Sequence, residues 1–342
     1  MRVCGPPRGD PAGGASFPTL ITLDAIQAAA ARLRGRIART PLRRSDWLSH
    51  ASDGDVHLKL EVVQPAASYK IRGAFNAALC IVERAGGTPP PLITASAGNH
   101  GRALAYAARA LGLKLTVFIA AEAPRAKVDA IREAGAELRP CRDYDEAEAR
   151  AKAAAAAGDG LFISPYSHPD VIAGAGTIGV ELVEDAAGLD AVIVPVGGGG
   201  LISGIGVAVK ALAPATRVIG VEVSASCPFT RSLEAGRLVH IDVAPTLADG
   251  LAGNLDPDTI TFDLVRAVVD GIVVVGEPAL RRGVSDIVRH EHLIVEGAAA
   301  TGPAAIVTKK IDLKGQRAAV ILSGANSDTR KLVEILAGSD GG

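Results

Sequence analysis

The sequence is poor in aromatic residues, which make up 3% of its 342 residues and include a single tryptophan. Alanine, valine, leucine and isoleucine must therefore build the hydrophobic core. Hydrophobic residues as a whole reach 48% and charged residues 21%, a globular balance that excludes a wholly disordered chain. A chain of this length suits two lobes that share an interface.

Cysteines are also few, and the four in the sequence (Cys4, Cys80, Cys141 and Cys227) lie far apart. Because none is paired at a metal-binding or redox spacing, we predict neither a zinc site nor a disulfide framework, and we expect a reducing, cytoplasmic compartment. Residues 1–17 are rich in glycine and proline and lack the apolar segment of a signal peptide. We expect them to form a disordered N-terminal extension.

No excess of one charge is present, since 36 basic residues balance 37 acidic ones. Without a block of lysine and arginine, neither nucleic acid nor a membrane surface is an expected partner. The uncharged stretch 191–209 approaches the length of a membrane span, but Pro195 and four glycines interrupt it. It is better explained as a buried strand, a glycine turn and a helix.

Apolar strands alternate with helices along most of the sequence, which predicts an α/β fold with parallel sheets covered on both faces. In such folds ligands bind beyond the carboxyl ends of the strands, so the informative residues should follow strands directly. The expected strands are 57–62, 92–95, 114–119, 191–196, 218–223, 271–275 and 318–322, and the main expected helices are 70–85, 101–111, 125–134, 143–157, 171–187, 201–212, 278–290 and 297–309.

A glycine run, Gly197-Gly198-Gly199-Gly200, follows one of these strands and precedes a helix. Glycines let backbone N–H groups approach an anion, and a helix N-terminus adds a favourable dipole. The run lacks the Lys-Ser/Thr of a Walker loop, which disfavours a nucleoside triphosphate. A tight turn of packing glycines is the alternative, but four in succession exceed what a turn needs, so we favour a phosphate cradle.

Two further loops follow strands. Ser96-Ala97-Gly98-Asn99-His100-Gly101 offers hydroxyl, amide and N–H donors suited to a carboxylate, although an ordinary capped turn would look similar. Ser323-Gly324-Ala325-Asn326 follows the last strand, where Ser323 could instead cap a helix that begins near Asp328.

Lys70 lies near the start of a helix, in Ser68-Tyr69-Lys70-Ile71-Arg72-Gly73-Ala74. A Schiff-base lysine needs a partly desolvated amine. A lone lysine usually belongs to a solvated surface, so Lys70 becomes informative only in combination with the three loops.

These motifs, preceded by Glu61-Val62-Val63-Gln64-Pro65 and accompanied by His168-Pro169-Asp170-Val171-Ile172-Ala173-Gly174, resemble in their order the threonine/serine dehydratase group of fold-type II pyridoxal-phosphate enzymes, which includes the serine racemases. The resemblance covers residues 22–334. It implies a tryptophan synthase β-like α/β fold with two lobes, each built on a largely parallel sheet flanked by helices. The large lobe would comprise residues 18–90 and 168–338, and the small inserted lobe residues 91–167.

The resemblance also implies roles for the motif residues. Lys70 would bind pyridoxal 5'-phosphate as a Schiff base and act as general base, and Ser96 would join it in catalysis. Asn99 would bond the ring 3-oxygen and Ser323 would face the pyridine nitrogen. The cofactor site would comprise Lys70, Tyr69, Asn99, Gly197, Gly198, Gly199, Gly200, Leu201 and Ser323, and the substrate site Ser68, Ser96, Ala97, Gly98, Asn99 and His100.

The expected reaction is elimination of water from a small β-hydroxy amino acid such as threonine or serine, which yields a 2-keto acid and ammonia. Racemisation is the alternative chemistry, but Ala97 stands where the serine racemases carry a proton-transferring serine. Ala66-Ala67 replaces the usual Thr-Gly, so phenylserine or hydroxyaspartate stay open as substrates. A non-catalytic binding protein on the same fold is a further alternative.

A divalent cation is doubtful. Relatives with a cation site have a glutamate after a strand and an aspartate six residues later. Here Glu222 is present, but Pro228 occupies the second position and offers no side-chain oxygen. We therefore expect no metal site, or a weakened one, and we expect a homodimer or a higher homo-oligomer acting on a small amino acid.

Overall fold

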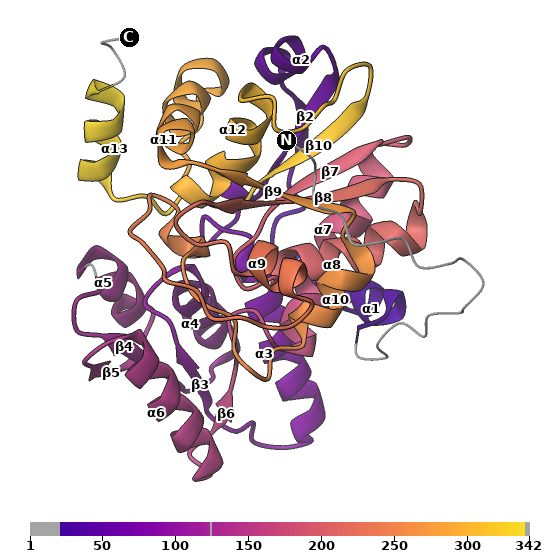
Figure 1. Ribbon diagram of the computed structural model, residues 1–342. Helices are drawn as coiled ribbons and strands as arrows, with labels where there is room; N and C mark the ends of the chain where they lie inside the picture. Colours follow the sequence, from indigo (N-terminus) through magenta and orange to yellow (C-terminus); the bar gives the residue numbers. More distant parts are fainter. Residues whose placement is uncertain (1–20, 124, 339–342) are drawn as a thin grey trace.

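Two separate β-sheets organise the chain (Figure 1). The structure is a computed structural model that describes residues 21–123 and 125–338, so the extension expected at 1–17 lies outside the described residues. One sheet has six strands in the order β1-β2-β10-β7-β8-β9, and the other has four in the order β5-β4-β3-β6.

The six-stranded sheet is parallel except for the edge strand β1, which runs antiparallel to β2. Its apolar strands are buried on both faces, and alternate residues point to opposite sides. Ile193 faces a core shared with α2, α11 and α12, whereas its neighbours Val192 and Val194 face a core shared with α7, α8 and α10. The strands are β1 (Leu42–Arg44), β2 (Asp55–Leu60), β7 (Ala191–Pro195), β8 (Arg217–Val223), β9 (Gly271–Val275) and β10 (Arg317–Leu322).

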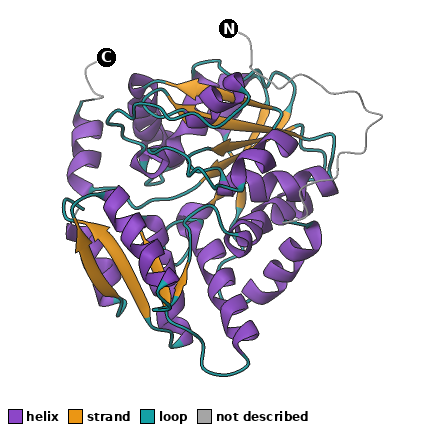
Figure 2. Ribbon diagram, turned by 60° about the horizontal axis from the view of Figure 1, so that its bottom comes forward, coloured by secondary structure: helices purple, strands orange, loops and turns teal. Residues whose placement is uncertain are grey.

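The four-stranded sheet is wholly parallel and lies apart from the larger one, as Figure 2 shows. Leu92 and Val117 face a core shared with α3 and α4, and Ile93 and Phe118 face α6 on the other side. Its strands are β3 (Leu92–Ala95), β4 (Leu115–Ala120), β5 (Glu137–Cys141) and β6 (Leu161–Phe162).

Helix starts follow ordinary capping chemistry. Thr22, Ser45, Asp143 and Asp328 each accept a hydrogen bond from the first turn of the helix that follows. The helices are α1 (Leu23–Leu33), α2 (Asp46–Ser52), α3 (Lys70–Ala85), α4 (Asn99–Leu111), α5 (Arg125–Glu133), α6 (Tyr144–Ala156), α7 (Pro169–Asp185), α8 (Gly200–Leu212), α9 (Pro228–Ala235), α10 (Thr261–Val268), α11 (Glu277–Asp286), α12 (Thr301–Val307) and α13 (Thr329–Ala337).

The predicted α/β fold with parallel sheets is confirmed, and most elements lie within a few residues of their expected positions. Two expected helices are shorter than predicted. Helix 278–290 ends at Asp286 and continues as a π-helical turn, and the first residues of 297–309 form a 3-10 turn. Among the residues that the structure describes, no helix is both apolar enough and long enough to cross a membrane.

Candidate active site

The predicted loops come together at the carboxyl ends of their strands, since β7 and β10 are parallel neighbours and Asn326 donates to Asn99. The loop after β10 lies beside the segment that precedes Lys70, because the backbone N–H of Tyr69 donates to the oxygen of Ser323 at 2.9 Å. Ser68 pairs with Gly324 in an isolated β-bridge, and its side chain is buried. The loop that carries Ser323 therefore holds the two residues before Lys70 in place through backbone contacts.

Lys70 is the first residue of α3, and its side chain is only half-buried. Its Nζ donates to the backbone oxygen of Pro165 at 2.7 Å and lies 5.2 Å from the centre of the Tyr69 ring. Pro165 belongs to the segment that leaves β6 and leads into α7. The amine is thus held at the junction of the two sheets.

The glycine run forms the turn into α8, with Gly199 in the left-handed conformation at φ 84°. No side chain caps this helix, although Gly199 and Gly200 are buried. Uncapped N–H groups at a buried helix start are what an anion requires. Leu201 is buried in the first turn of the same helix.

Tyr166, which the sequence analysis missed, packs directly on this run. A Cβ placed on Gly198 would lie 2.3 Å from Cγ of Tyr166. The tyrosine hydroxyl accepts a hydrogen bond from the backbone N–H of Asp256 at 3.0 Å. Tyr166 directly follows Pro165, which accepts the hydrogen bond of Lys70. One short segment therefore contacts both Lys70 and the glycine run.

The loop after β3 turns sharply into α4. A Cβ at Gly101 would lie 1.9 Å from the oxygen of Ser96, so only glycine fits there. The hydroxyl of Ser96 accepts from the N–H of Gly98 at 3.2 Å, and it does not cap α4. Ala97 packs against the apolar core of the small sheet.

His100 is buried beneath this loop, with Nε2 3.2 Å from the oxygen of Ile163. A carbonyl only accepts, so Nε2 carries the hydrogen and Nδ1 is bare. Burial, together with the nearby charge of Lys70, lowers the pKa of His100 to about 3. His100 is therefore neutral at ordinary pH, and its role is to hold the Ser96 loop against the segment that contains Ile163.

Asn99 contacts Glu296, a second residue that the sequence analysis missed. Its Nδ2 lies 2.8 Å and 2.9 Å from the two carboxylate oxygens. Glu296 is buried, and burial raises the pKa of its carboxyl group. The available signal was a lone acid directly before the small-residue run Gly297-Ala298-Ala299-Ala300.

The structure also decides the alternative explanation for the loop after β10. Asp328, and not Ser323, caps α13, by accepting from the N–H groups of Arg330 and Lys331. Ser323 is buried at the end of its strand.

Glu222 has other partners than a metal. Its carboxylate accepts from the N–H of Phe229 at 2.9 Å and from the N–H and hydroxyl of Thr230 at 2.8 Å and 2.6 Å. It therefore caps α9, whose preceding residue Cys227 provides no cap. The described residues contain no group of three or more His, Cys, Asp or Glu side chains that could hold a metal ion.

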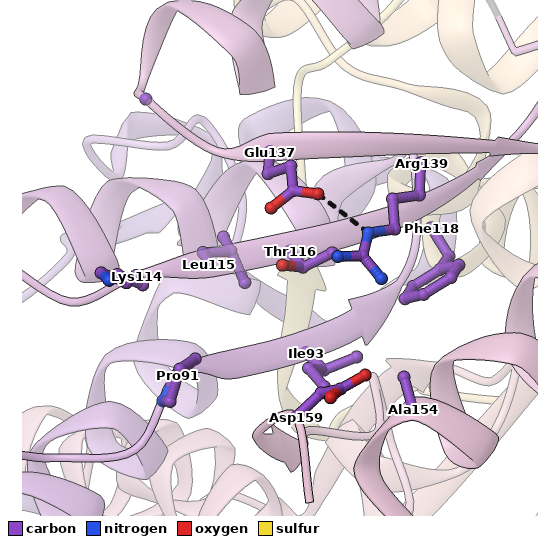
Figure 3. A pocket seen from close by; sticks show the side chains of 11 residues that line it. Pro91, Ile93, Lys114, Leu115, Thr116, Phe118, Glu137, Arg139, Ala154 and Asp159 are labelled. Carbon is purple, nitrogen blue, oxygen red and sulfur yellow. Dashed lines mark hydrogen bonds and ion pairs between the residues drawn. The ribbon is translucent and has the colours of Figure 1, made fainter. Parts of the chain in front are cut away.

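A cavity of about 390 Å³ lies elsewhere, at the amino ends of β3, β4 and β5 (Figure 3). Pro91, Lys114 and Glu137 line it, and Glu137 pairs with Arg139. Ligands of parallel sheets bind at the opposite, carboxyl edge. We therefore place the site at the convergence of the loops.

Comparison with known proteins shows the family of the chain. Residues 33–324 match the family described as "Pyridoxal-phosphate dependent enzyme". The chain belongs to this pyridoxal-phosphate family. It is 38% identical over 320 residues to the L-threonine ammonia-lyase of Thermotoga maritima, covering 93% of this chain and 78% of that protein.

Two further members of the family are informative. The L-threo-3-hydroxyaspartate ammonia-lyase of Saccharomyces cerevisiae is 34% identical over 314 residues, which cover 91% of this chain and 95% of that protein. The crystal structure of serine racemase from Dictyostelium discoideum superposes with a TM-score of 0.84 at 32% identity, covering 90% of this chain and 99% of the other. The predicted membership and fold type of this pyridoxal-phosphate enzyme are confirmed.

Proposed function

We propose that this protein is an ammonia-lyase that eliminates water from a small β-hydroxy amino acid of the threonine or serine type. The observation that carries the proposal is the contact of the Lys70 amine with the oxygen of Pro165, the residue before the Tyr166 that packs on the glycine run. Relatives named L-threonine ammonia-lyase and L-threonine dehydratase, which match over most of the chain, support this reaction.

The residues at the site fit pyridoxal phosphate. The uncapped start of α8 suits its phosphate, and the half-buried amine of Lys70 suits its aldehyde. When bound, the cofactor supplies a conjugated ring that disperses the charge left at the α-carbon. Asn99 would face the ring oxygen, Tyr69 the ring and Ser323 the ring nitrogen.

Lys70 and the Ser96 loop would divide the remaining work. Ser96 and the N–H groups of Gly98 and Asn99 would hold the substrate carboxylate, and Ser68 would line the same space. Lys70 Nζ would take the α-proton and return it to the β-oxygen as the C–O bond breaks, so that the hydroxyl would leave as water and the electron pair of the C–H bond would form the C=C bond. The unsaturated amine that results is hydrolysed by water to a 2-keto acid and ammonia.

Racemisation is the second candidate, supported by the similarity to a serine racemase. It needs a proton carrier on the far face of the substrate. Ala97 has no such group, and His100 is held as a neutral donor to Ile163. Elimination is therefore favoured.

Substrate preference within this class rests on the turn before Ser68. Ala67 adopts a left-handed conformation at φ 52°, where glycine is ordinarily favoured, and its oxygen accepts from the N–H of Ala325. Because this turn differs from the Thr-Gly of the family, hydroxyaspartate and phenylserine are tested as substrates beside threonine and serine. A relative named for L-threo-3-hydroxyaspartate supports the first of these.

We further infer that catalysis needs no divalent cation, because the N-terminus of α9 already satisfies Glu222. A lobe at 91–167, inserted between 18–90 and 168–338, accords with the separate four-stranded sheet.

We also propose a homodimer or higher homo-oligomer in which a second copy covers the exposed side chains of Val63 and Ile294. Buried free Cys80, Cys141 and Cys227 suit a reducing cytoplasm.

A keto-acid assay over L- and D-threonine, serine, hydroxyaspartate and phenylserine tests the reaction. We expect keto acid from an L-substrate, unchanged by a chelator, together with visible absorbance from the bound cofactor. Absorbance without keto acid from any substrate would favour a binding protein. D-serine formed from L-serine as fast as keto acid would favour a racemase.

A further inference from the structure

Four polar side chains form a relay from α4 to the loops of the six-stranded sheet. Arg102 donates to Oδ1 of Asn326 at 2.7 Å. Nδ2 of Asn326 donates to the oxygen of Ala66 at 3.0 Å and to Oδ1 of Asn99 at 2.7 Å. Nδ2 of Asn99 then donates to Glu296, which ends the relay.

The chemistry of the partners fixes the orientation of both amides. A guanidinium only donates and a backbone carbonyl only accepts, so Asn326 must turn Oδ1 to Arg102 and Nδ2 to Ala66. Asn99 must then present Oδ1 to Asn326 and Nδ2 to Glu296. The two oxygens of one carboxylate lie too close together for both N–H groups of an amide, which diverge by about 120°, to point at them, so Glu296 shares a single N–H of Asn99. The other N–H is left over from these contacts, and its direction is set by the relay.

Glu296 is built into the site. Its backbone N–H donates to the oxygen of Gly324 at 3.0 Å, and a Cβ on Gly324 would lie 2.6 Å from Oε1. The charged groups that face it are Lys70, Lys127 and Asp249. Both carboxylate oxygens accept from an amide that can only donate there, an arrangement that suits the ionised form.

We propose that Glu296 is a positioning residue that acts through Asn99. Together with Asn326 it turns the remaining N–H of Asn99 toward the cofactor ring oxygen and so strengthens the binding of pyridoxal phosphate. The inference depends on cofactor binding and holds whichever amino acid is the substrate.

The test is titration of the cofactor-free protein with pyridoxal phosphate, followed by visible absorbance. Glu296→Gln removes the charge and one acceptor, so we expect roughly a tenfold higher dissociation constant, the size of one charge-assisted hydrogen bond. In the Asn99→Ala background the same change should alter it by less than about twofold, because the relay is already broken.

The pH dependence of binding is a second readout. Burial raises the pKa of Glu296, so wild type should lose cofactor affinity as the pH falls into the acid range, before an ordinary carboxyl group is protonated. Glu296→Gln should lose less over the same range.

Glu291→Gln is the matched control, because Glu291 is also a buried acid but contacts Arg43 and Ser45. It should leave cofactor affinity unchanged. Should Glu296→Gln fail to fold, Asn326→Leu breaks the relay from its other side and should give the same tenfold loss, absent in the Asn99→Ala background. Wild-type affinity in either variant, or full additivity with Asn99→Ala, would overturn the proposal.

Discussion

The ring of Tyr166 lies against Gly198 so closely that a Cβ on the glycine would stand 2.3 Å from Cγ of the tyrosine. One residue earlier, Pro165 accepts the hydrogen bond of Lys70. A single segment therefore supports both the phosphate-binding turn and the reactive amine. A side chain introduced at Gly198 should therefore displace both the phosphate-binding turn and the segment that contacts the Lys70 amine.

Gly198→Ala should weaken cofactor binding by at least about tenfold and destabilise the fold by about 1–3 kcal/mol, because the ring cannot move aside without shifting the turn. Gly87→Ala is the control, since a Cβ there meets only an oxygen at 4.0 Å. Pyridoxal phosphate titration and thermal unfolding measure the two effects. Equal behaviour of the two variants would contradict the packing argument.

Arg72 is 1% exposed and binds Glu61 and Glu181 through its guanidinium. Burial alone would raise the pKa of the Glu61 carboxyl group, but the charge and hydrogen bonds of Arg72 outweigh the effect of burial, and the pKa is lowered. Arg72→Ala would leave a buried carboxylate unpaired and should cost about 3–5 kcal/mol of unfolding free energy.

Arg84 on the same helix provides the control for this change. It pairs with Asp170, but its side chain is 67% exposed, so Arg84→Ala should cost at most about 1 kcal/mol. Denaturant unfolding of the two variants compares them directly. A similar loss in both would mean that burial of the Arg72 network is unimportant.

Burial raises the pKa of Glu222 to about 7, from an ordinary value near 4.5, although its bonds to α9 oppose the shift. The folded state therefore binds the proton more tightly than the unfolded state, and the stability that this confers is lost as the pH rises from about 4.5 through 7. Between these pH values the free energy of unfolding of the wild type should fall by on the order of 3 kcal/mol more than that of Glu222→Gln. Denaturant unfolding at pH 4.5 and 8 measures it, and parallel losses in both proteins would refute it.

Ala97→Ser would introduce a hydroxyl at the position where racemases carry a proton donor. We expect D-serine to appear from L-serine while keto-acid production persists. Chiral chromatography of the products measures the ratio. Ala97→Val, which adds bulk without an exchangeable proton, is the control and should yield no D-serine. If Ala97→Ser also yields no D-serine, a hydroxyl at this position is not sufficient for racemisation.

The sequence was sufficient to predict most of the strands and the loops that follow them, but not the strands β1, β5 and β6. Apolar runs such as 191–196 are continuous because both faces of a parallel sheet are covered, and glycine runs and polar loops at their ends mark the ligand edge. The prediction that Lys70 lies near the start of a helix that continues to Ala85 is confirmed.

Contacts between distant segments could not be predicted in the same way. Glu296 meets Asn99 across 197 positions of sequence, and Tyr166, which follows the last strand of the small sheet, packs on a glycine run at the end of a strand of the other sheet. The edge strand Leu42–Arg44 is short and polar, so its pattern lacks the apolar alternation of a strand. The capping of α9 by Glu222 depends on the bend after β8, which no local signal indicates.

The central claim is that Lys70 carries the cofactor and removes the α-proton. The most direct measurement is the visible spectrum and keto-acid production of Lys70→Ala beside Lys114→Ala, an exposed lysine at the opposite edge of the small sheet. We predict that Lys70→Ala loses the absorbance of the lysine-bound cofactor and all turnover, while Lys114→Ala retains both. An unchanged spectrum with full turnover in Lys70→Ala would contradict the account.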